Sequence, residues 1–344
     1  MKYNKLGKTE IDVSVICLGT MTWGEQNTEK EAWAQLDFAL DKDVNFIDNA
    51  ELYPVPANAE TSGLTETYLG NWIKARKNRD KFILATKIAG PGPYTAHIRD
   101  IKTYSRQNFR DAIEGSLRRL QTDYIDLYQI HWPERATNFF GKRAYTHQEG
   151  WEDNMKMRLE ILHEYINKGA IKYIGISNET AWGTMNYLKL SELFDLPRIA
   201  TVQNPYNLLN RTYEGGLAEV SIRENAGLIA YSPLAFGRLT DKYIDGTAGP
   251  ESRLNKYKHF ARYNTESCLL ATQKYYEIAQ SVGLSLAQLS LAWVNQQQFV
   301  TSNIIGATNL KQLEENIATH ALKLDEETVK RINEVQELLP NPAP

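Results

Sequence analysis

The chain of 344 residues is poor in cysteine, with only Cys17 and Cys268, and these lie far apart in the sequence. Two isolated cysteines support neither a disulfide framework nor a zinc site, so both are expected to be reduced thiols. No apolar stretch is long enough to span a bilayer, and no leader-like apolar segment follows the N-terminal lysines. We therefore expect a cytoplasmic protein without a membrane partner.

An excess of charge of either sign is also missing. The formal net charge is -3 and the sequence pI is about 6.1, which gives no global electrostatic reason to bind nucleic acid. The six histidines show no metal-ligand spacing, and His163-Glu164 lacks the second histidine of a zincin helix. The sequence thus predicts a protein that binds no nucleic acid and no catalytic metal.

The common nucleotide-binding motifs are absent as well. No Gly-x-Gly-x-x-Gly follows an apolar run, and no Gly-x-x-x-x-Gly-Lys-[Ser/Thr] occurs. These absences disfavour a Rossmann site and a P-loop. A nicotinamide dinucleotide, if one is used, must be held by another geometry.

What the sequence does contain is a regular alternation of short apolar runs and amphipathic segments. Eight strands are expected at residues 15–19, 45–48, 82–87, 125–131, 171–177, 199–203, 228–232 and 303–306. Helices are expected between them, among others at residues 31–40, 109–120, 157–166, 184–193 and 310–317. Strand followed by helix eight times over favours a closed (β/α)8 TIM barrel, with an open doubly wound sheet as the alternative.

Further segments frame this single predicted domain, which spans residues 1–344. A β-hairpin is expected within residues 1–15, and an appended helix at residues 325–338 is expected to cap one end of the barrel. Long loops follow three strands, at about residues 53–63, 132–150 and 235–267. Loops after barrel strands surround the active site, so these three are expected to shape specificity and the cofactor site.

Four chemically active residues lie at or just beyond strand ends: Asp48, Tyr53, Lys87 and His131. Because the carboxyl ends of parallel strands converge on one face of a barrel, these side chains are expected to share a pocket. A lysine beside a phenol favours its ionised form, and a carboxylate keeps the lysine charged. For each residue taken singly there is an alternative interpretation: Asp48 and Lys87 as a structural ion pair, and His131 as a core imidazole.

Polar residues at other strand ends suggest how a nicotinamide is held. Ser177, Asn178 and Gln203 end the fifth and sixth strands, and amide side chains offer both the donor and the acceptor that a carboxamide needs. Tyr231 ends the seventh strand and presents a flat face for an aromatic ring. Lys242 and Arg253, on the loop that follows, offer cations for phosphates, beside an anion site expected where a helix begins near residue 309.

Four sequence stretches resemble signature motifs of the aldo-keto reductase superfamily. They are Leu18-Gly19-Thr20-Met21-Thr22-Trp23-Gly24, the run from Phe46 to Tyr53, the run from Arg119 to Leu127, and Ile174-Gly175-Ile176-Ser177-Asn178. The likeness runs over nearly the whole chain. It is greatest to the bacterial Tas-like branch, which is related to the potassium-channel β-subunit group.

The resemblance implies a metal-free barrel that binds NADPH and reduces a small aldehyde or ketone. It makes Tyr53 the general acid, Lys87 the group that lowers its pKa, Asp48 the partner of Lys87, and His131 the residue that orients the carbonyl. Residues that would contact the cofactor are Gly19, Thr20, Met21, Ser177, Asn178, Gln203, Tyr231, Ser232, Leu234, Gly237, Lys242, Arg253, Thr308, Gln312, Glu315 and Asn316. An apolar substrate wall is expected to include Trp23 and Trp132.

One departure and two rival functions stay open at this point. Residues 54–63 form a longer insert after Tyr53 than common members have, so the substrate rules of the family transfer poorly. Lys87 would be a Schiff-base nucleophile in a lyase. A cofactor-sensing regulatory subunit with slow reductase activity is the alternative from the binding class. No oligomeric state is predicted.

Overall fold

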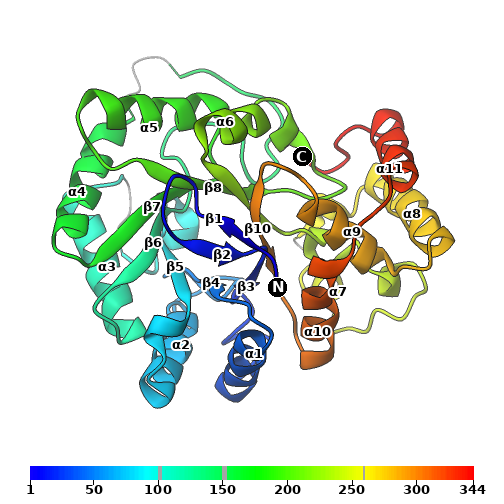
Figure 1. Cartoon of the computed structure of the whole chain (residues 1–344), viewed down its shortest axis with the longest axis horizontal. Coiled ribbons are helices and arrows are strands. Elements are labelled where there is room, and N and C mark those ends of the chain that lie inside the picture. The colour runs from blue at the N-terminus through cyan, green and yellow to red at the C-terminus, as the bar shows by residue number, and fades with distance from the viewer. Residues whose placement is uncertain (100–102, 149–152, 259) are drawn as a thin grey trace.

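The protein folds into a closed barrel of eight parallel strands, as a computed structural model shows (Figure 1). The structure describes residues 1–99, 103–148, 153–258 and 260–344. The barrel strands follow the order β10, β3, β4, β5, β6, β7, β8, β9. Their bounds are β3 Ile16–Gly19, β4 Phe46–Asp48, β5 Ile83–Ile88, β6 Ile125–Ile130, β7 Ile171–Ser177, β8 Ile199–Pro205, β9 Gly227–Tyr231 and β10 Val300–Ile305. The predicted (β/α)8 barrel is therefore confirmed, and the open sheet is excluded.

The barrel strands are almost entirely buried because both faces of a barrel strand are covered. In β6 all six residues are buried. One face meets the barrel interior, where Leu127 packs with Ala85 and Ile229, while Tyr128 belongs to the larger core between strands and helices. The register of β5 and β6 sets Lys87 opposite Gln129, which places both polar side chains near the carboxyl ends of the strands.

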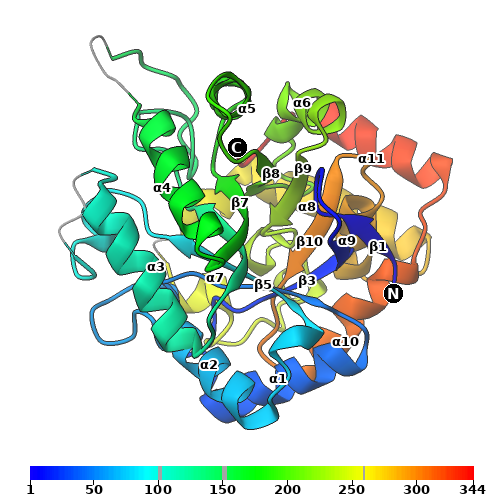
Figure 2. The same ribbon diagram turned by 60° about the vertical axis from the view of Figure 1, so that its left-hand side comes forward.

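Helices surround the barrel on its outside (Figures 1 and 2). Their bounds are α1 Glu29–Asp41, α2 Leu64–Arg76, α3 Arg106–Leu120, α4 Met155–Asn167, α5 Ala181–Leu193, α6 Leu217–Glu224, α7 Arg253–Lys256, α8 Glu266–Ser281, α9 Leu286–Asn295, α10 Leu310–Ala318 and α11 Glu326–Leu338. Short 3-10 turns are η1 Arg79–Lys81, η2 Pro93–Thr95, η3 Thr212–Glu214, η4 Ala235–Gly237, η5 Asp241–Tyr243, η6 Ala261–Tyr263 and η7 Thr319–Ala321.

Several helices begin two or three residues before the predicted start. The side chains of Thr28, Ser105 and Thr180 accept hydrogen bonds from backbone N-H groups of the first turns of α1, α3 and α5. These caps satisfy donors that have no partner within the helix. The apolar pattern begins one turn later than the cap, so it identified the helices but placed their starts too late.

The predicted hairpin closes the N-terminal end of the barrel. Strands β1 Tyr3–Lys5 and β2 Asp12–Ser14 pair in antiparallel fashion across the barrel opening (Figure 1). Leu6 and Val13 are fully buried and pack with residues of the barrel interior. Water is thus excluded from this end, and the opposite end is left for a site.

The C-terminal helix does not cap a barrel end, contrary to expectation. Helix α11 packs against α8 on the periphery of the molecule (Figure 1). Its buried side chains, Ile332 and Val335, join the core of the outer helices. Beyond it the chain crosses to the barrel, where Ala343 N donates to Leu209 O at 2.9 Å.

Candidate active site

One large cavity opens at the carboxyl ends of the barrel strands, with a volume of about 1390 Å³. It is lined by every residue predicted to bind or react except Lys87 and Trp23. Those lining residues are Gly19, Thr20, Met21, Asp48, Tyr53, His131, Trp132, Ser177, Asn178, Gln203, Tyr231, Ser232, Leu234, Gly237, Lys242, Arg253, Thr308, Gln312, Glu315 and Asn316. The fold therefore gathers residues that are up to 297 positions apart in the sequence, from Gly19 to Asn316.

Asp48 and Lys87 form a buried ion pair at the floor of this cavity. Lys87 Nζ lies 2.7 Å from Asp48 Oδ2 and donates a second bond of 2.6 Å to Asn49 O. The other carboxylate oxygen of Asp48 accepts from Gln203 Nε2 at 2.8 Å and from Gln129 Nε2 at 3.2 Å. A buried charge pair is stable only when its remaining lone pairs are satisfied, and these two amides satisfy them.

Tyr53 follows β4, and its ring lies over the lysine. The distance from Lys87 Nζ to the ring centroid of Tyr53 is 4.9 Å. Burial raises the pKa of the Tyr53 phenol above its ordinary value, and the charge and hydrogen bond of Lys87 offset only part of that rise. The expected lowering of this pKa is therefore wrong for the net shift, because it counted the cation and neglected the loss of water.

The ammonium itself stays charged. Burial by itself lowers the pKa of Lys87, but Asp48 and then Tyr53 outweigh the burial, and the net pKa is raised. A protonated lysine cannot attack a carbonyl as a nucleophile. It remains a fixed cation beside the phenol.

His131 lies beside Tyr53 in the cavity as a neutral imidazole. Burial first, and the Lys87 charge second, hold the pKa of His131 well below its ordinary value. Its ring meets that of Tyr53 edge to face, with the centroids 5.9 Å apart. Its Nδ1 is buried and finds no hydrogen-bond partner within the described parts of the chain.

The row of polar residues predicted to hold a carboxamide is connected by its own hydrogen bonds. Ser177 Oγ donates to Gln203 O at 2.7 Å, and Asn178 Nδ2 donates to His131 O at 2.8 Å. The phenol of Tyr231 donates to Asn178 Oδ1 at 2.6 Å. The Nε2 of Gln203 is committed to Asp48, so a ligand amide would meet its Oε1 instead.

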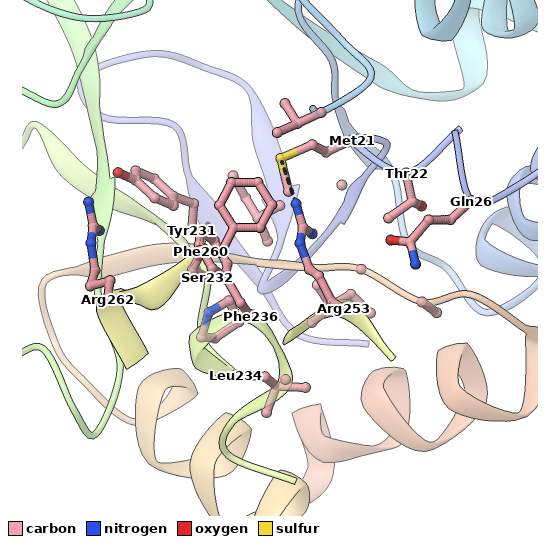
Figure 3. A pocket seen from close by; sticks show the side chains of 18 of the residues that line it. Met21, Thr22, Gln26, Tyr231, Ser232, Leu234, Phe236, Arg253, Phe260 and Arg262 are labelled. Atoms are coloured by element: carbon pink, nitrogen blue, oxygen red, sulfur yellow. Dashed lines mark hydrogen bonds between the residues drawn. The ribbon is translucent and has the colours of Figure 1, made fainter. Parts of the chain in front are cut away.

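Two cations that have no carboxylate partner among the described residues, Arg253 and Lys242, also line the cavity, and Figure 3 shows Arg253. Arg253 lies beside Met21, with Nη2 3.8 Å from Sδ, and its guanidinium stacks on Phe236 at 4.9 Å from the ring centroid. Its Nε is buried and has no hydrogen-bond partner among residues 1–99, 103–148, 153–258 and 260–344. Burial lowers the pKa of Arg253 to about 10, so it stays charged at neutral pH.

Lys242 on η5 is the second of these cations, and its pKa is lowered by burial. No ion pair joins Lys242 or Arg253 to a carboxylate of the described residues, whereas the neighbouring Glu251 pairs with Lys256 at 2.9 Å. Partly buried cations without anions are costly unless a ligand supplies the negative charge. The two cations therefore suit the phosphates of a dinucleotide.

Helix α10 begins beside the cavity, with Asn309 as its N-cap. Asn309 Oδ1 accepts from Gln312 N at 3.0 Å. Gln312 Oε1 does not return to Asn309 and instead accepts from Thr308 N at 3.1 Å and Thr308 Oγ1 at 3.0 Å. Thr308, Gln312, Glu315 and Asn316 nevertheless line the cavity together.

Of the two tryptophans predicted for a substrate wall, only Trp132 lines the cavity. Trp132 lines the cavity, donates from Nε1 to Pro91 O at 2.9 Å, and meets the ring of Phe140 with the centroids 5.7 Å apart. Trp23 is fully buried, and its Nε1 donates to Gln35 Oε1 at 3.1 Å behind the cavity wall. Trp23 is thus a core residue, because the turn after β3 directs it toward α1.

The insert after Tyr53 folds back on the cavity. Gly63 N donates to Tyr53 O at 2.9 Å, and Val55 N donates to Met21 O at 3.1 Å. Val55, Pro56 and Ala57 become part of the cavity lining. The last two residues of the predicted 132–150 loop, and residue 259 of the predicted 235–267 loop, lie outside the described residues.

Several residues in the cavity or next to it were not predicted to belong to the site. Gln129 bonds Asp48 but was missed, although it lies two positions before His131 in the expected strand 125–131, a spacing that puts both side chains on one face. Phe236 and Arg262 line the cavity and lie on the long loop after β9, where no periodicity marks a side chain that faces inward. Gly90 lies against Trp132, where an added Cβ would come within 2.6 Å of Cδ1.

The described residues hold neither a candidate metal site nor a candidate membrane-spanning helix. Among the residues that the structure describes, no group of three or more His, Cys, Asp or Glu side chains could hold a metal ion. Over the same residues, no helix is both long and apolar enough to cross a membrane.

The tyrosine, the buried Lys-Asp pair and the histidine lie at the carboxyl ends of the barrel strands, the face on which barrel enzymes carry their active sites. The sequence model of the Aldo/keto reductase family matches residues 15–337. The chain belongs to the aldo/keto reductase family, whose members use nicotinamide cofactors, and it has an oxidoreductase role.

Individual relatives agree with this assignment. The chain is similar to Protein tas of Escherichia coli K12, at 47% identity over 100% of both chains. It is similar to the uncharacterized oxidoreductase YrpG of Bacillus subtilis, at 33% identity over 97% of this chain and 96% of the relative. A probable voltage-gated potassium channel subunit beta of Arabidopsis thaliana is 32% identical over 92% of this chain and 90% of its own. The likeness to the Tas-like branch is thereby confirmed.

Proposed function

We propose that the protein reduces aldehydes or ketones to alcohols with NADPH, and that Tyr53 is the general acid. The observation that carries this proposal is the buried arrangement of Tyr53, Lys87 and Asp48 at the floor of the cavity. A reduced nicotinamide, when bound, supplies the hydride. The remaining steps are performed by side chains of the chain itself.

The proton comes from the Tyr53 hydroxyl. The raised pKa keeps this phenol protonated at neutral pH, so a proton is present to transfer to the oxygen of the substrate. The Lys87 ammonium stabilises the phenolate that remains, and Asp48 holds the ammonium in place at 2.7 Å. This arrangement suits an acid that must give up a proton only when an alkoxide forms.

His131 orients the carbonyl in this proposal. As a neutral imidazole beside Tyr53 it donates a hydrogen bond without adding a charge that would compete with Lys87. Its backbone carbonyl accepts a hydrogen bond from Asn178 Nδ2, which fixes the position of His131 relative to Asn178 and Gln203. The substrate oxygen is thereby directed at both the phenol and the imidazole.

The preference for NADPH over NADH rests on two cations that line the cavity. Arg253 and Lys242 offer positive charge for the phosphates of the cofactor, including a 2′-phosphate. A site for NAD would favour a carboxylate directed at the ribose hydroxyls. The unpartnered Nε of Arg253 supports a bound anion.

The rival functions have less support. A Schiff-base lyase needs a neutral lysine, whereas Lys87 is held charged by Asp48. A cofactor-sensing subunit is suggested by the likeness to the Arabidopsis relative, a probable voltage-gated potassium channel subunit beta. It would retain NADPH tightly without turnover.

A titration of tryptophan fluorescence with NADPH and with NADH, followed by NADPH oxidation assays over a panel of aldehydes and ketones, tests the proposal. We expect tighter binding of NADPH and turnover of at least some carbonyls. Quenching without turnover of any carbonyl would favour the cofactor-sensing role. Borohydride trapping of a carbonyl on the protein in the absence of nicotinamide would favour the lyase.

A further inference from the structure

A third cation, Arg262, faces the cavity at a place distinct from that of Arg253. It lies on η6 beside Tyr231, whereas Arg253 lies beside Met21, as Figure 3 shows. No carboxylate among the described residues forms an ion pair with Arg262, and the Tyr263 ring lies 6.0 Å from its guanidinium carbon. Arg262 also lines the cavity.

Arg262 is connected to His131 through its neighbours. Burial raises the pKa of the Tyr231 phenol, and the Arg262 guanidinium lies close enough for its charge to oppose that rise. Tyr231 donates to Asn178 Oδ1 at 2.6 Å, and Asn178 in turn donates to the backbone of His131 at 2.8 Å. The charge of Arg262 is therefore connected to the proposed carbonyl site by two hydrogen-bonded residues.

The two long loops meet at this arginine. An added Cβ at Gly141 would lie 3.1 Å from Arg262 Nε, and Gly141 has a φ of +89° that disfavours other residues. Glycine thus lets the backbone of the 132–150 loop approach the guanidinium closely. Arg143, two residues on, lines the rim of the same cavity and donates to Pro342 O at 3.2 Å.

The acidic residues of the cavity do not neutralise these arginines. Asp48 is paired with Lys87, and Glu251 with Lys256. Asp241 Oδ1 accepts from Leu286 N at 2.7 Å, and Glu315 lies on α10. Pro344, the last residue of the sequence, also lines the cavity, but no ion pair joins Arg262 or Arg143 to a carboxylate of the described residues. Both positive charges lie beside an otherwise aromatic wall formed by Trp132 and Phe140.

We infer that the substrate is a carbonyl compound that also carries a carboxylate or a phosphate, and that Arg262 binds this anionic group with Arg143 at the rim. This inference rests on the proposed reductase function and names its substrate class. The planar guanidinium matches either anion with two parallel hydrogen bonds. The aromatic wall then contacts the short carbon chain between the anion and the carbonyl.

Matched pairs of substrates test the inference in the NADPH-loaded protein. The pairs are 4-oxobutanoate against butanal, and glycolaldehyde phosphate against glycolaldehyde. For the intact protein we expect kcat/KM to be higher for the charged member of at least one pair, by roughly 10- to 100-fold, the usual effect of a hydrogen-bonded charged group. The pair that shows it identifies carboxylate or phosphate.

Substitution of the arginine tests which side chain is responsible. Arg262→Gln should reduce the ratio of charged to uncharged kcat/KM by roughly 10-fold or more, mainly through KM, and Arg262→Lys should keep part of it. Arg143→Gln should lower the same ratio less, because Arg143 is exposed. The exposed Arg118 on α3 supplies the control, and Arg118→Gln should leave the ratio as it is.

The outcomes separate this inference from the proposed function. Equal kcat/KM for charged and uncharged members, with turnover of both, would overturn the anionic substrate and leave the reductase intact. An unchanged ratio in Arg262→Gln, with NADPH affinity weakened instead, would make Arg262 a cofactor residue and also overturn the inference. Absence of turnover with all four aldehydes despite NADPH binding would contradict the proposed function itself.

Discussion

Lys87 and Asp48 form an ion pair of 2.7 Å in which both side chains are almost completely buried. The pair joins β5 to β4 and places a fixed positive charge 4.9 Å from the ring of Tyr53. Removal of one partner leaves the other charge buried without compensation. The pair therefore connects the stability of the barrel to the chemistry proposed for its cavity.

Breaking this pair should reduce both stability and activity. Lys87→Met leaves the Asp48 carboxylate buried, and we expect a loss of about 3–5 kcal/mol in the free energy of unfolding. The double variant Lys87→Met with Asp48→Asn removes both charges and should recover part of that stability but none of the activity. Urea unfolding and NADPH oxidation measure the two effects. Retained activity in the double variant would contradict the role of the ammonium.

The phenol of Tyr53 is expected to supply the proton. Tyr53→Phe should lower the rate of carbonyl reduction by roughly 10²- to 10⁴-fold, the usual contribution of general acid catalysis. NADPH binding, followed by fluorescence quenching, should change little, because the hydroxyl alone is removed. Tyr3→Phe is the matched control, since Tyr3 lies on the exposed hairpin and donates to Asp43 O at 2.9 Å. Reduction at the parental rate by Tyr53→Phe would exclude the assigned acid.

The pH dependence of reduction follows from two pKa shifts of opposite direction. Tyr53 must be protonated, and its pKa is raised above 10.0, so the acid persists into alkaline solution. His131 must be neutral, and its pKa lies well below 6.5, so it stays neutral into mildly acidic solution. We expect kcat for reduction to be nearly constant from about pH 7 to about pH 9 and to fall only beyond the ordinary pKa of tyrosine. A limb centred near the ordinary histidine pKa would contradict the neutral imidazole.

Arg253 is expected to bind a cofactor phosphate. Arg253→Gln should raise the Kd of NADPH by roughly 10- to 100-fold, because it removes hydrogen bonds to a charged group. The stacking of the guanidinium on Phe236 should be lost as well, so Arg253→Lys is expected to restore only part of the affinity. Fluorescence titration measures both variants, with Arg118→Gln as the control. An unchanged Kd would place the phosphates elsewhere in the cavity.

Gly90 is expected to be needed for the position of Trp132. Gly90→Ala would bring a methyl group within 2.6 Å of Trp132 Cδ1, so the indole must shift and its 2.9 Å bond to Pro91 O must lengthen or break. Overpacking of this kind typically costs about 1–3 kcal/mol, and the displaced wall should change the KM for the carbonyl. Gly249→Ala is the matched control, since an added Cβ there meets nothing within 4 Å.

The fold and much of the candidate site could be predicted because they depend on local patterns. Apolar runs that end in polar residues identified the barrel strands, and parallel strands must bring their carboxyl ends to one face. That rule placed Asp48, Tyr53 and His131 at one cavity before any contact was known. The four signature stretches indicated the family because each is a run of neighbouring residues that can be recognised without the fold.

Only the tertiary structure decided the properties that depend on surroundings. Three properties differ from expectation: the net pKa of Tyr53, the burial of Trp23 and the packing of α11 against α8. Each depends on elements that are far away in the sequence and that exclude water where they pack. The inward position of Arg262 likewise depends on two loops that meet in space. Sequence periodicity reports which face of an element is apolar, whereas desolvation and charge balance are set by every group packed around a site.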